Sequence, residues 1–134
     1  MRFLSCLSLF LIAGCVTVPR SDQASIVGTW TDETRSFEKT YFADGTSCGS
    51  YKFVDPPHDP NYIYSFRSTW QLKDKVLTST VITSDDADLT PGSVFVDHID
   101  SFHPDKFFYR ADDSSDTEVR YRVLPTRSEA DCKV

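Results

Sequence analysis

The sequence predicts an all-β domain, an eight-stranded antiparallel up-and-down barrel, and three observations carry this prediction. From residue 26 onward, Thr, Val, Tyr, Phe and Ser dominate the chain, as is typical of strands. Turn residues recur at short intervals between runs in which apolar and polar residues alternate. The connections are short and hairpin-like, and eight such strands can close on themselves, which removes exposed sheet edges.

Each predicted strand ends at a group of turn residues. Asp44-Gly45, between two runs of strand-forming residues, is among the strongest hairpin signals. The other main connections are polar, acidic or proline-rich and cover residues 55–61, 73–75, 85–92, 103–105 and 112–116. The predicted strands are residues 26–33, 36–43, 46–54, 62–72, 76–84, 93–102, 106–111 and 117–124.

Alternation predicts which side chains face the barrel interior. Along residues 62–72 the aromatic residues share one side, and in the last strand Val119, Tyr121 and Val123 share a side opposite Glu118, Arg120 and Arg122. An eight-stranded barrel is either packed or holds one small ligand. The candidate ligand-binding residues are therefore the inward aromatics Tyr64, Phe66 and Trp70, with Tyr121 or Phe107 opposite them. The alternative is that these side chains only fill the barrel.

The numbers of acidic and basic residues limit which classes of molecule the protein is expected to bind. The chain carries 14 basic and 20 acidic residues, a net charge of −6. This balance argues against nucleic-acid binding, which requires a basic surface. It is compatible with a cationic partner, although an acidic surface commonly serves only solubility.

The N-terminus has the pattern of an export signal. Arg2 precedes an apolar run that ends in Leu11-Ile12-Ala13-Gly14-Cys15. This stretch resembles a bacterial lipoprotein signal, which implies cleavage before Cys15 and acylation of that residue. The apolar run is too short for a membrane-spanning helix, and an ordinary secretory signal with a spare thiol is the other alternative. We expect a signal peptide over residues 1–14, a lipidated tether over 15–25 and the barrel over 26–134.

The residue that follows the lipidated cysteine indicates to which membrane a bacterial lipoprotein is sent. Val16 follows Cys15 where an aspartate would resemble an inner-membrane signal, so the resemblance implies an outer-membrane lipoprotein facing the periplasm or the cell surface. Two acyl chains hold a protein stably on a membrane. Loss of Arg2 with the signal would shift the net charge from −6 to −7.

Cys48 and Cys132 are predicted to form a disulfide. An exported chain enters an oxidising compartment, where an even pair of cysteines favours a disulfide over free thiols. The alternative is a metal site, but no histidine or cysteine stands at zinc-ligand spacing near either residue. The bond would tie the C-terminus back to the second hairpin.

Three short motifs stand in a particular order along the first half of the domain. They are Gly28-Thr29-Trp30, Tyr41-Phe42-Ala43-Asp44-Gly45-Thr46, and Trp70 followed by Lys73-Asp74-Lys75-Val76-Leu77. In this order they resemble the bacterial lipocalin-like domains, which are small secreted or lipid-anchored barrels. The resemblance implies that Trp30 closes one end of the barrel and that an arginine of the last strand, Arg120 or Arg122, packs across it.

No motif for catalysis or cofactor binding is present, so we expect no cofactor, no catalytic residue and no metal. His58 and His103 belong to proline-containing loops, and His98 stands between Asp97 and Ile99 in a strand, where a half-exposed structural position explains it. The acidic runs 85–88 and 112–116 fit solvated turns, with calcium binding as the minor alternative.

These features predict a non-enzymatic, lipid-anchored envelope barrel that binds a small apolar ligand or serves as an interaction module. The alternative is an inhibitor or protective binder of a cationic protein such as a lysozyme, because known periplasmic lysozyme inhibitors are small barrel lipoproteins with a disulfide. Electrostatic steering by the acidic chain suits that alternative. An enzyme that uses His98 with Asp97 or Asp100 ranks last.

Overall fold

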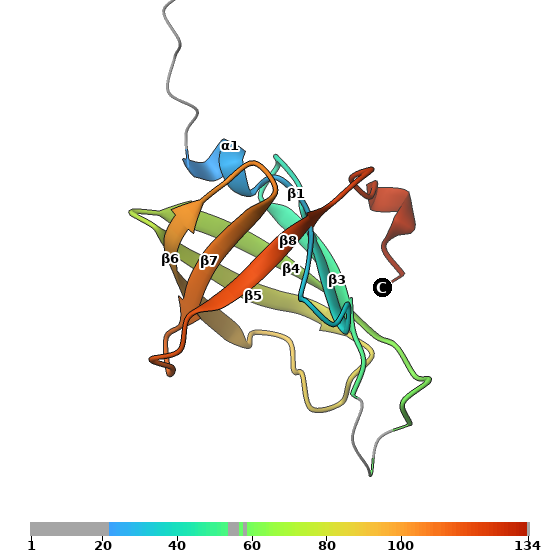
Figure 1. Cartoon of the computed structure of the whole chain (residues 1–134). Coiled ribbons are helices and arrows are strands. Elements are labelled where there is room, and N and C mark those ends of the chain that lie inside the picture. Colours follow the sequence, from blue (N-terminus) through green and yellow to red (C-terminus); the bar gives the residue numbers. More distant parts are fainter. Residues whose placement is uncertain (1–21, 54–56, 58, 134) are drawn as a thin grey trace, which may run out of the picture.

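The computed structural model describes residues 22–53, 57 and 59–133. Its eight strands form a closed antiparallel barrel in which each strand pairs with the next and β8 pairs with β1 (Figure 1). This confirms the predicted fold class. The strands are β1 (Gly28–Thr31), β2 (Phe37–Tyr41), β3 (Thr46–Tyr51), β4 (Tyr64–Lys73), β5 (Val76–Ser84), β6 (Val94–Phe102), β7 (Lys106–Ala111) and β8 (Glu118–Val123).

The strand bounds differ from the predicted ones by at most three residues. The main difference lies before β1, where Asp22–Ile26 forms the helix α1. Residues 22–25 were expected in the tether, and Ile26 in the first strand. Ile26 is fully buried in the core, which anchors α1 to the barrel. The folded domain therefore begins at least four residues before the predicted boundary.

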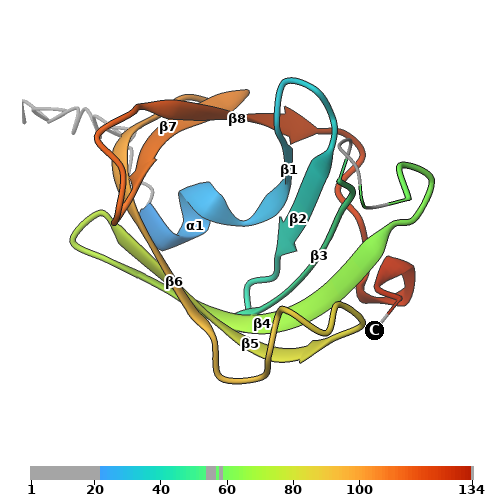
Figure 2. The same cartoon turned by 90° about the horizontal axis from the view of Figure 1, so that it is seen from below.

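The barrel has two unlike ends. The segment containing α1 lies across one of them, which we call the helix end (Figure 2). The short turns at residues 42–45, 74–75 and 103–105 lie at this end because the strands run up and down in sequence order. The longer connections lie at the opposite end, which we call the loop end; their described residues are 32–36, 52–53, 57, 59–63, 85–93 and 112–117.

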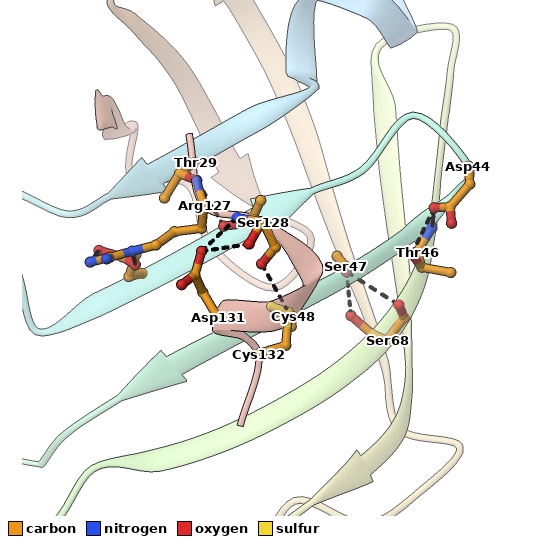
Figure 3. The surroundings of a disulfide bond; sticks show 12 residues. Thr29, Asp44, Thr46, Ser47, Cys48, Ser68, Arg127, Ser128, Asp131 and Cys132 are labelled. Atoms are coloured by element: carbon orange, nitrogen blue, oxygen red, sulfur yellow. Dashed lines mark hydrogen bonds and ion pairs between the residues drawn. A yellow bond between two sulfur atoms is a disulfide. The ribbon is translucent and has the colours of Figure 1, made fainter. Parts of the chain in front are cut away.

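The C-terminal strap, residues 124–133, turns back over the outer wall of β1, β2 and β3. A disulfide joins Cys48 on β3 to Cys132, which follows the short 3-10 helix η1 (Glu129–Asp131) (Figure 3). The Arg127 guanidinium pairs with Glu38 at 2.8 Å, and the Arg127 backbone N–H donates to Thr29 Oγ1 at 2.8 Å. The predicted disulfide is confirmed.

The core lies inside the barrel and is concentrated toward the helix end. Its buried members come from α1 and from most of the strands: Ile26, Trp30, Tyr41, Trp70, Leu72, Leu77, Ile99, Phe107 and Tyr109. Within the described part of the chain, no helix is both long and apolar enough to cross a bilayer.

Candidate functional site in the barrel interior

Trp30 and Arg122 seal the helix end together with α1. The Trp30 side chain is 1% exposed, and its Nε1 donates a hydrogen bond to the Ile26 carbonyl oxygen at 2.7 Å. The Arg122 guanidinium carbon lies 4.1 Å from the Trp30 ring centroid, and its nitrogens donate to the carbonyl oxygens of Val27 and Ser25. Such a cation–π contact contributes about 0.5 to 2 kcal/mol. The arginine thus links the indole to the segment that covers it.

The structure explains why glycine occupies the first position of the Gly-x-Trp motif, Gly28. Its φ is +140°, a conformation that residues with a side chain rarely adopt, and a Cβ there would collide with the Arg122 guanidinium. The resemblance left Arg120 and Arg122 as candidates for the arginine across Trp30. Arg122 takes this position in the structure.

Two of the aromatic residues expected to contact a ligand lie in the apolar core. Phe107 packs edge-on against Trp30 with ring centroids 4.7 Å apart, and Trp70 packs edge-on against Tyr41 at 5.6 Å. Trp70 Nε1 donates to the Phe42 carbonyl oxygen at 3.0 Å, so its polar atom is satisfied by the backbone. Trp70 and Phe107 therefore help to fill the interior.

Beyond this core, three charged side chains that are at least partly buried lie on the inner face of the barrel, and the exposed Glu118, opposite Tyr109, lies on the same face. Residues directly opposite each other on antiparallel strands face the same side of a sheet. The relevant pairs are Lys39 with Trp30, Asp97 with Leu77, and Arg120 with Phe107. Since each second member of these pairs is a core residue, Lys39, Asp97 and Arg120 face inward. We call these three residues the inner charged layer.

Lys39 is the most buried member of the inner charged layer. It is 6% exposed, and its Nζ donates to Ser79 Oγ at 2.8 Å. The ammonium lies 4.8 Å from the Tyr41 ring centroid and 5.6 Å from that of Phe66. Among the described residues, no carboxylate oxygen lies within 4 Å of Nζ. An ammonium has three donors, and one of them has a hydrogen-bond partner here.

The electrostatics show what this burial costs. Burial lowers the pKa of Lys39 to about 8; nearby Asp97 opposes the shift and Arg120 adds to it. Burial also raises the pKa of Asp97, against the effects of Lys39 and Arg120. Apolar side chains would fill the same space without the penalty of burying charge. Perturbed pKa values of this kind cluster at functional sites.

Arg120 connects the inner charged layer to solvent. Its guanidinium carbon lies 4.6 Å from the Phe37 ring centroid and 4.9 Å from that of Tyr109. Glu118 Oε2 accepts a hydrogen bond from the Tyr109 hydroxyl at 2.6 Å and lies 3.9 Å from Arg120 Nη2. The Arg120 side chain is 19% exposed, so solvent reaches part of it.

Aromatic side chains continue from Lys39 toward the loop end. Phe66 is buried beside Lys39 with its ring over Gly49. Tyr51 stacks on Tyr64 with ring centroids 5.5 Å apart, and its hydroxyl donates to Asp86. Phe53 and Tyr62 pack edge-on against Tyr64 and complete a loop-end aromatic cluster of Tyr51, Phe53, Tyr62 and Tyr64. The predicted residues Phe66 and Tyr64 thus lie on one path from the interior to the loop end.

The expectation that Tyr121 faces the interior is wrong. Tyr121 lies opposite Thr31 on β1 and Lys106 on β7, on the outer face, and is 37% exposed. Arg120 and Arg122 occupy the inner positions of β8 instead. Both guanidinium groups lie over aromatic rings inside the barrel, which offsets part of the cost of burying them.

His98, His103 and the acidic loop at residues 112–116 stand apart from the interior, whereas Asp86 of the other acidic loop contacts Tyr51. His98 lies on the outer face of β6 with its Nε2 2.7 Å from Asp112 Oδ1, and both side chains are exposed. His103 lies in a turn at the helix end. Over the described ranges, no three His, Cys, Asp or Glu side chains come together as a metal site. Cys15 and His58 lie outside the described residues.

A groove of about 370 Å³ lies outside the barrel beneath the C-terminal strap. Glu38, Arg127 and the Cys48–Cys132 disulfide contribute to its lining. The two charged side chains pair with each other at 2.8 Å. These groups already hold the strap on the barrel. We therefore interpret the groove as part of the contact between the strap and the barrel wall.

Lys39 is not among the site residues predicted from the sequence. Asp97 is predicted only as a partner of His98 in the enzyme that ranks last, and Arg120 only as a candidate partner of Trp30. Lys39 stands between Phe37 and Tyr41, two residues away from each. A lysine that shares the aromatic face of a strand is the signal that could have found it, since such a lysine faces inward with its aromatic neighbours. For Asp97 and Arg120 the register between strands was required.

Comparison of this chain with known protein families, curated proteins and solved structures finds no match.

Proposed function

We propose that this protein is a non-enzymatic, lipid-anchored barrel of the bacterial cell envelope that binds a small, largely apolar ligand in the loop-end half of its interior. The observation that carries the proposal is the buried Lys39 ammonium, which has a single hydrogen-bond partner and lies between aromatic rings. A barrel that needed only a packed core would place an apolar side chain there.

The surroundings of Lys39 support a ligand with a large apolar part. Phe66 and Phe37 lie with ring centroids 6.3 Å apart, and the loop-end aromatic cluster follows them toward solvent. Small-molecule sites are lined mainly by apolar and aromatic groups, with a few polar groups that fix orientation. The contact of Arg122 with Trp30 supports the resemblance to the bacterial lipocalin-like domains.

The connection to the membrane gives the proposal an orientation. Cys15 precedes the first residue of α1 by seven positions, so an acylated Cys15 would lie within about 25 Å of α1. Since α1 lies across the helix end (Figure 1), the anchor would hold this end toward the membrane. The loop end would then point away from the bilayer, where a ligand can enter.

Native mass spectrometry of the protein purified from its own host in mild detergent tests the ligand. We expect an added mass that survives gentle ionisation and disappears on denaturation. A bare protein in every native preparation would contradict ligand carriage. The same spectra after denaturation test the anchor, because acyl chains on Cys15 remain covalently bound, and a Cys15→Ser variant should leave the membrane fraction.

A second candidate function, binding of a cationic protein, has one observation in its favour. Acidic residues surround the loop end, while the described basic residues in the same loops are Arg35 and Lys52. The described acidic residues there are Asp32, Glu33, Asp59, Asp85, Asp86, Asp88, Asp112, Asp113 and Asp116. A salt-sensitive complex with a basic protein such as lysozyme, in the absence of any bound small molecule, would favour this candidate.

A further inference from the structure

We propose that the loop-end aromatic cluster and the adjoining acidic loop, residues 85–88, form a docking surface for a basic polypeptide segment that carries apolar side chains beside its lysines or arginines. The inference rests on the second candidate function, binding of a cationic protein, and adds the surface and the chemistry of the segment that contacts it. It follows from where the exposed apolar side chains lie, what borders them and which charges surround them.

Exposed hydrophobic residues gather at the loop end. Among the described residues, eight large hydrophobic ones are exposed, and six of these lie in the loop-end connections or in the last three strand residues next to them. The six are Phe53, Tyr62, Ile63, Ile82, Val94 and Phe95. Exposed apolar groups that gather in one region of a surface mark an interaction site, whereas singly scattered ones do not.

The aromatic part of this region is packed and still presents ring surface to solvent. Phe53 packs edge-on against Tyr51 and Tyr64 with ring centroids 5.5 and 5.6 Å apart, and Tyr62 lies 4.7 Å from Tyr64. Phe53 is nevertheless 37% exposed and Tyr62 46% exposed. Because the rings hold one another in place, a partner that packs on them loses little side-chain entropy.

The acidic loop lies directly against this cluster. The Tyr51 hydroxyl donates a hydrogen bond to Asp86. Desolvation raises the pKa of Tyr64, and the nearby carboxylates of Asp86 and Asp88 raise it further. Asp88 is exposed. Aromatic rings and carboxylates therefore border each other on one continuous surface.

The surrounding charge decides which partner suits this surface. The described residues of the loop-end connections include nine acidic and two basic ones. This field repels nucleic acids and anionic bilayers, and a neutral glycan gains nothing from it. A basic segment with apolar side chains uses both features, since its cations reach carboxylates and ring faces while its apolar groups pack on the remaining aromatic surface.

The barrel interior contains the same combination of groups around one of the protein's own cations. The Arg120 guanidinium carbon lies 4.6 Å from the Phe37 ring centroid and 4.9 Å from that of Tyr109, and Arg120 Nη2 lies 3.9 Å from Glu118 Oε2. Rings beside a carboxylate thus accommodate a guanidinium within this chain. At the loop end, rings and carboxylates stand together on the surface, where the cation can come from a partner.

Three peptides test the surface on the exported full chain carrying Cys15→Ser, with isothermal titration calorimetry as the measurement. The first is an octapeptide of alternating lysine and leucine; in the second serine replaces leucine, and in the third glutamate replaces lysine. We expect the lysine–leucine peptide to bind at least about tenfold more tightly than either of the others. Raising the NaCl concentration from about 50 to about 500 mM should weaken its binding, because salt screens the carboxylates.

Two variants locate the contact, each with a matched control. Tyr62→Ala should weaken binding of the lysine–leucine peptide about fivefold or more, whereas Tyr121→Ala, exposed on the outer wall, should have no effect. Asp88→Asn should weaken binding about threefold or more, whereas Asp113→Asn, exposed in the connection between β7 and β8, should change it much less. All four side chains are exposed, so the variants should fold.

The outcomes separate this inference from the functions proposed above. Equal affinities for the lysine–leucine and lysine–serine peptides, equal losses in Asp88→Asn and Asp113→Asn, or binding of maltohexaose in place of the peptides would overturn the docking surface. A salt-sensitive complex with a basic folded protein would in that case leave the second candidate function standing. The absence of both peptide binding and such a complex would contradict both, and native mass spectrometry judges the small-ligand proposal independently.

Discussion

The helix end and the loop-end half of the barrel interior bury different kinds of groups. At the helix end, the polar atoms of Trp30 and Arg122 reach backbone carbonyl oxygens at distances of 2.7 to 3.1 Å. Farther along the same interior, Lys39 has one hydrogen bond, and Arg120 lies over two rings and remains partly exposed. One half satisfies its polar groups internally, and the other leaves hydrogen-bonding capacity unused.

This difference indicates that the two halves of the interior have different roles. Well-satisfied polar groups and close aromatic packing stabilise the native state. A buried and poorly satisfied charge lowers stability, and proteins commonly accept such a cost where a group serves binding or chemistry. We therefore assign stability to the helix end and, under the proposed function, ligand binding to the inner charged layer.

The largest expected effect is at the helix end. Trp30→Ala should lower the free energy of unfolding by about 3 to 5 kcal/mol, because it leaves a large cavity and removes the surface on which Arg122 packs. Urea denaturation measures this. The control is Phe95→Ala, at a position 49% exposed on β6, which should cost about 1 kcal/mol or less. Equal losses in the two variants would contradict the stabilising role of the helix end.

Loss of the disulfide should have the next largest effect. Replacing both Cys48 and Cys132 by serine should destabilise the protein by about 2 to 4 kcal/mol, since the bond closes a long loop with a sequence separation of 84. Because the strap lies on the outer wall, ligand binding inside the barrel should be retained under native conditions. Loss of binding in a folded double variant would connect the strap to the interior site.

Lys39→Met should stabilise the protein by up to about 3 kcal/mol at pH 7, as follows from a lysine pKa lowered from 10.5 to about 8. Below pH 8 the folded and unfolded wild-type chains both hold the proton, so the burial penalty is complete. Between pH 8 and 10.5 the folded state loses the proton first, and wild-type stability recovers. The advantage of the variant should therefore shrink over this range.

Denaturation of wild type and Lys39→Met at a series of pH values measures this advantage. Taking the difference between the two proteins cancels the titration of tyrosines that lie far from Lys39. A constant difference from pH 7 to pH 10.5, or a variant that is less stable at pH 7, would show that Lys39 is a satisfied structural group.

The smallest effect is expected on the outer face. Tyr121→Ala should change the free energy of unfolding by less than about 1 kcal/mol, because the side chain is partly exposed outside the barrel. Phe107→Ala, on the neighbouring strand but inside, should cost about 3 kcal/mol or more. Thermal or urea denaturation of the two variants compares their free energies of unfolding. The difference shows which face of the β7–β8 pair is buried.

Local features of the sequence were sufficient to predict most of the architecture. Turn chemistry such as Asp44-Gly45 and alternation of period two set the number, order and approximate bounds of the strands. The pairing of Cys48 with Cys132 followed from the even number of cysteines expected in an exported domain. The place of Trp30 at one end followed from the resemblance carried by its motif.

The orientation of β8 could not be predicted in the same way. Val119, Tyr121 and Val123 form the more apolar side of that strand, yet the arginine side faces inward. Alternation identifies two faces of a strand without saying which one is buried, and an apolar-inside rule fails when aromatic rings inside the barrel accept guanidinium groups. The helix α1 was missed because five residues show too little periodicity to distinguish a helix from a polar tether.

Strand content, turn positions and the disulfide partners are properties of short segments and of residue types, so they can be read along the chain. The inner charged layer is a property of closure: Lys39, Asp97 and Arg120 belong to β2, β6 and β8 and share an interior because β8 pairs with β1 in a particular register. A shift of one residue in that register would turn every β8 side chain to the other face. The charged interior therefore depends on pairing between strands that are far apart in the sequence. Short sequence patterns do not predict such pairing.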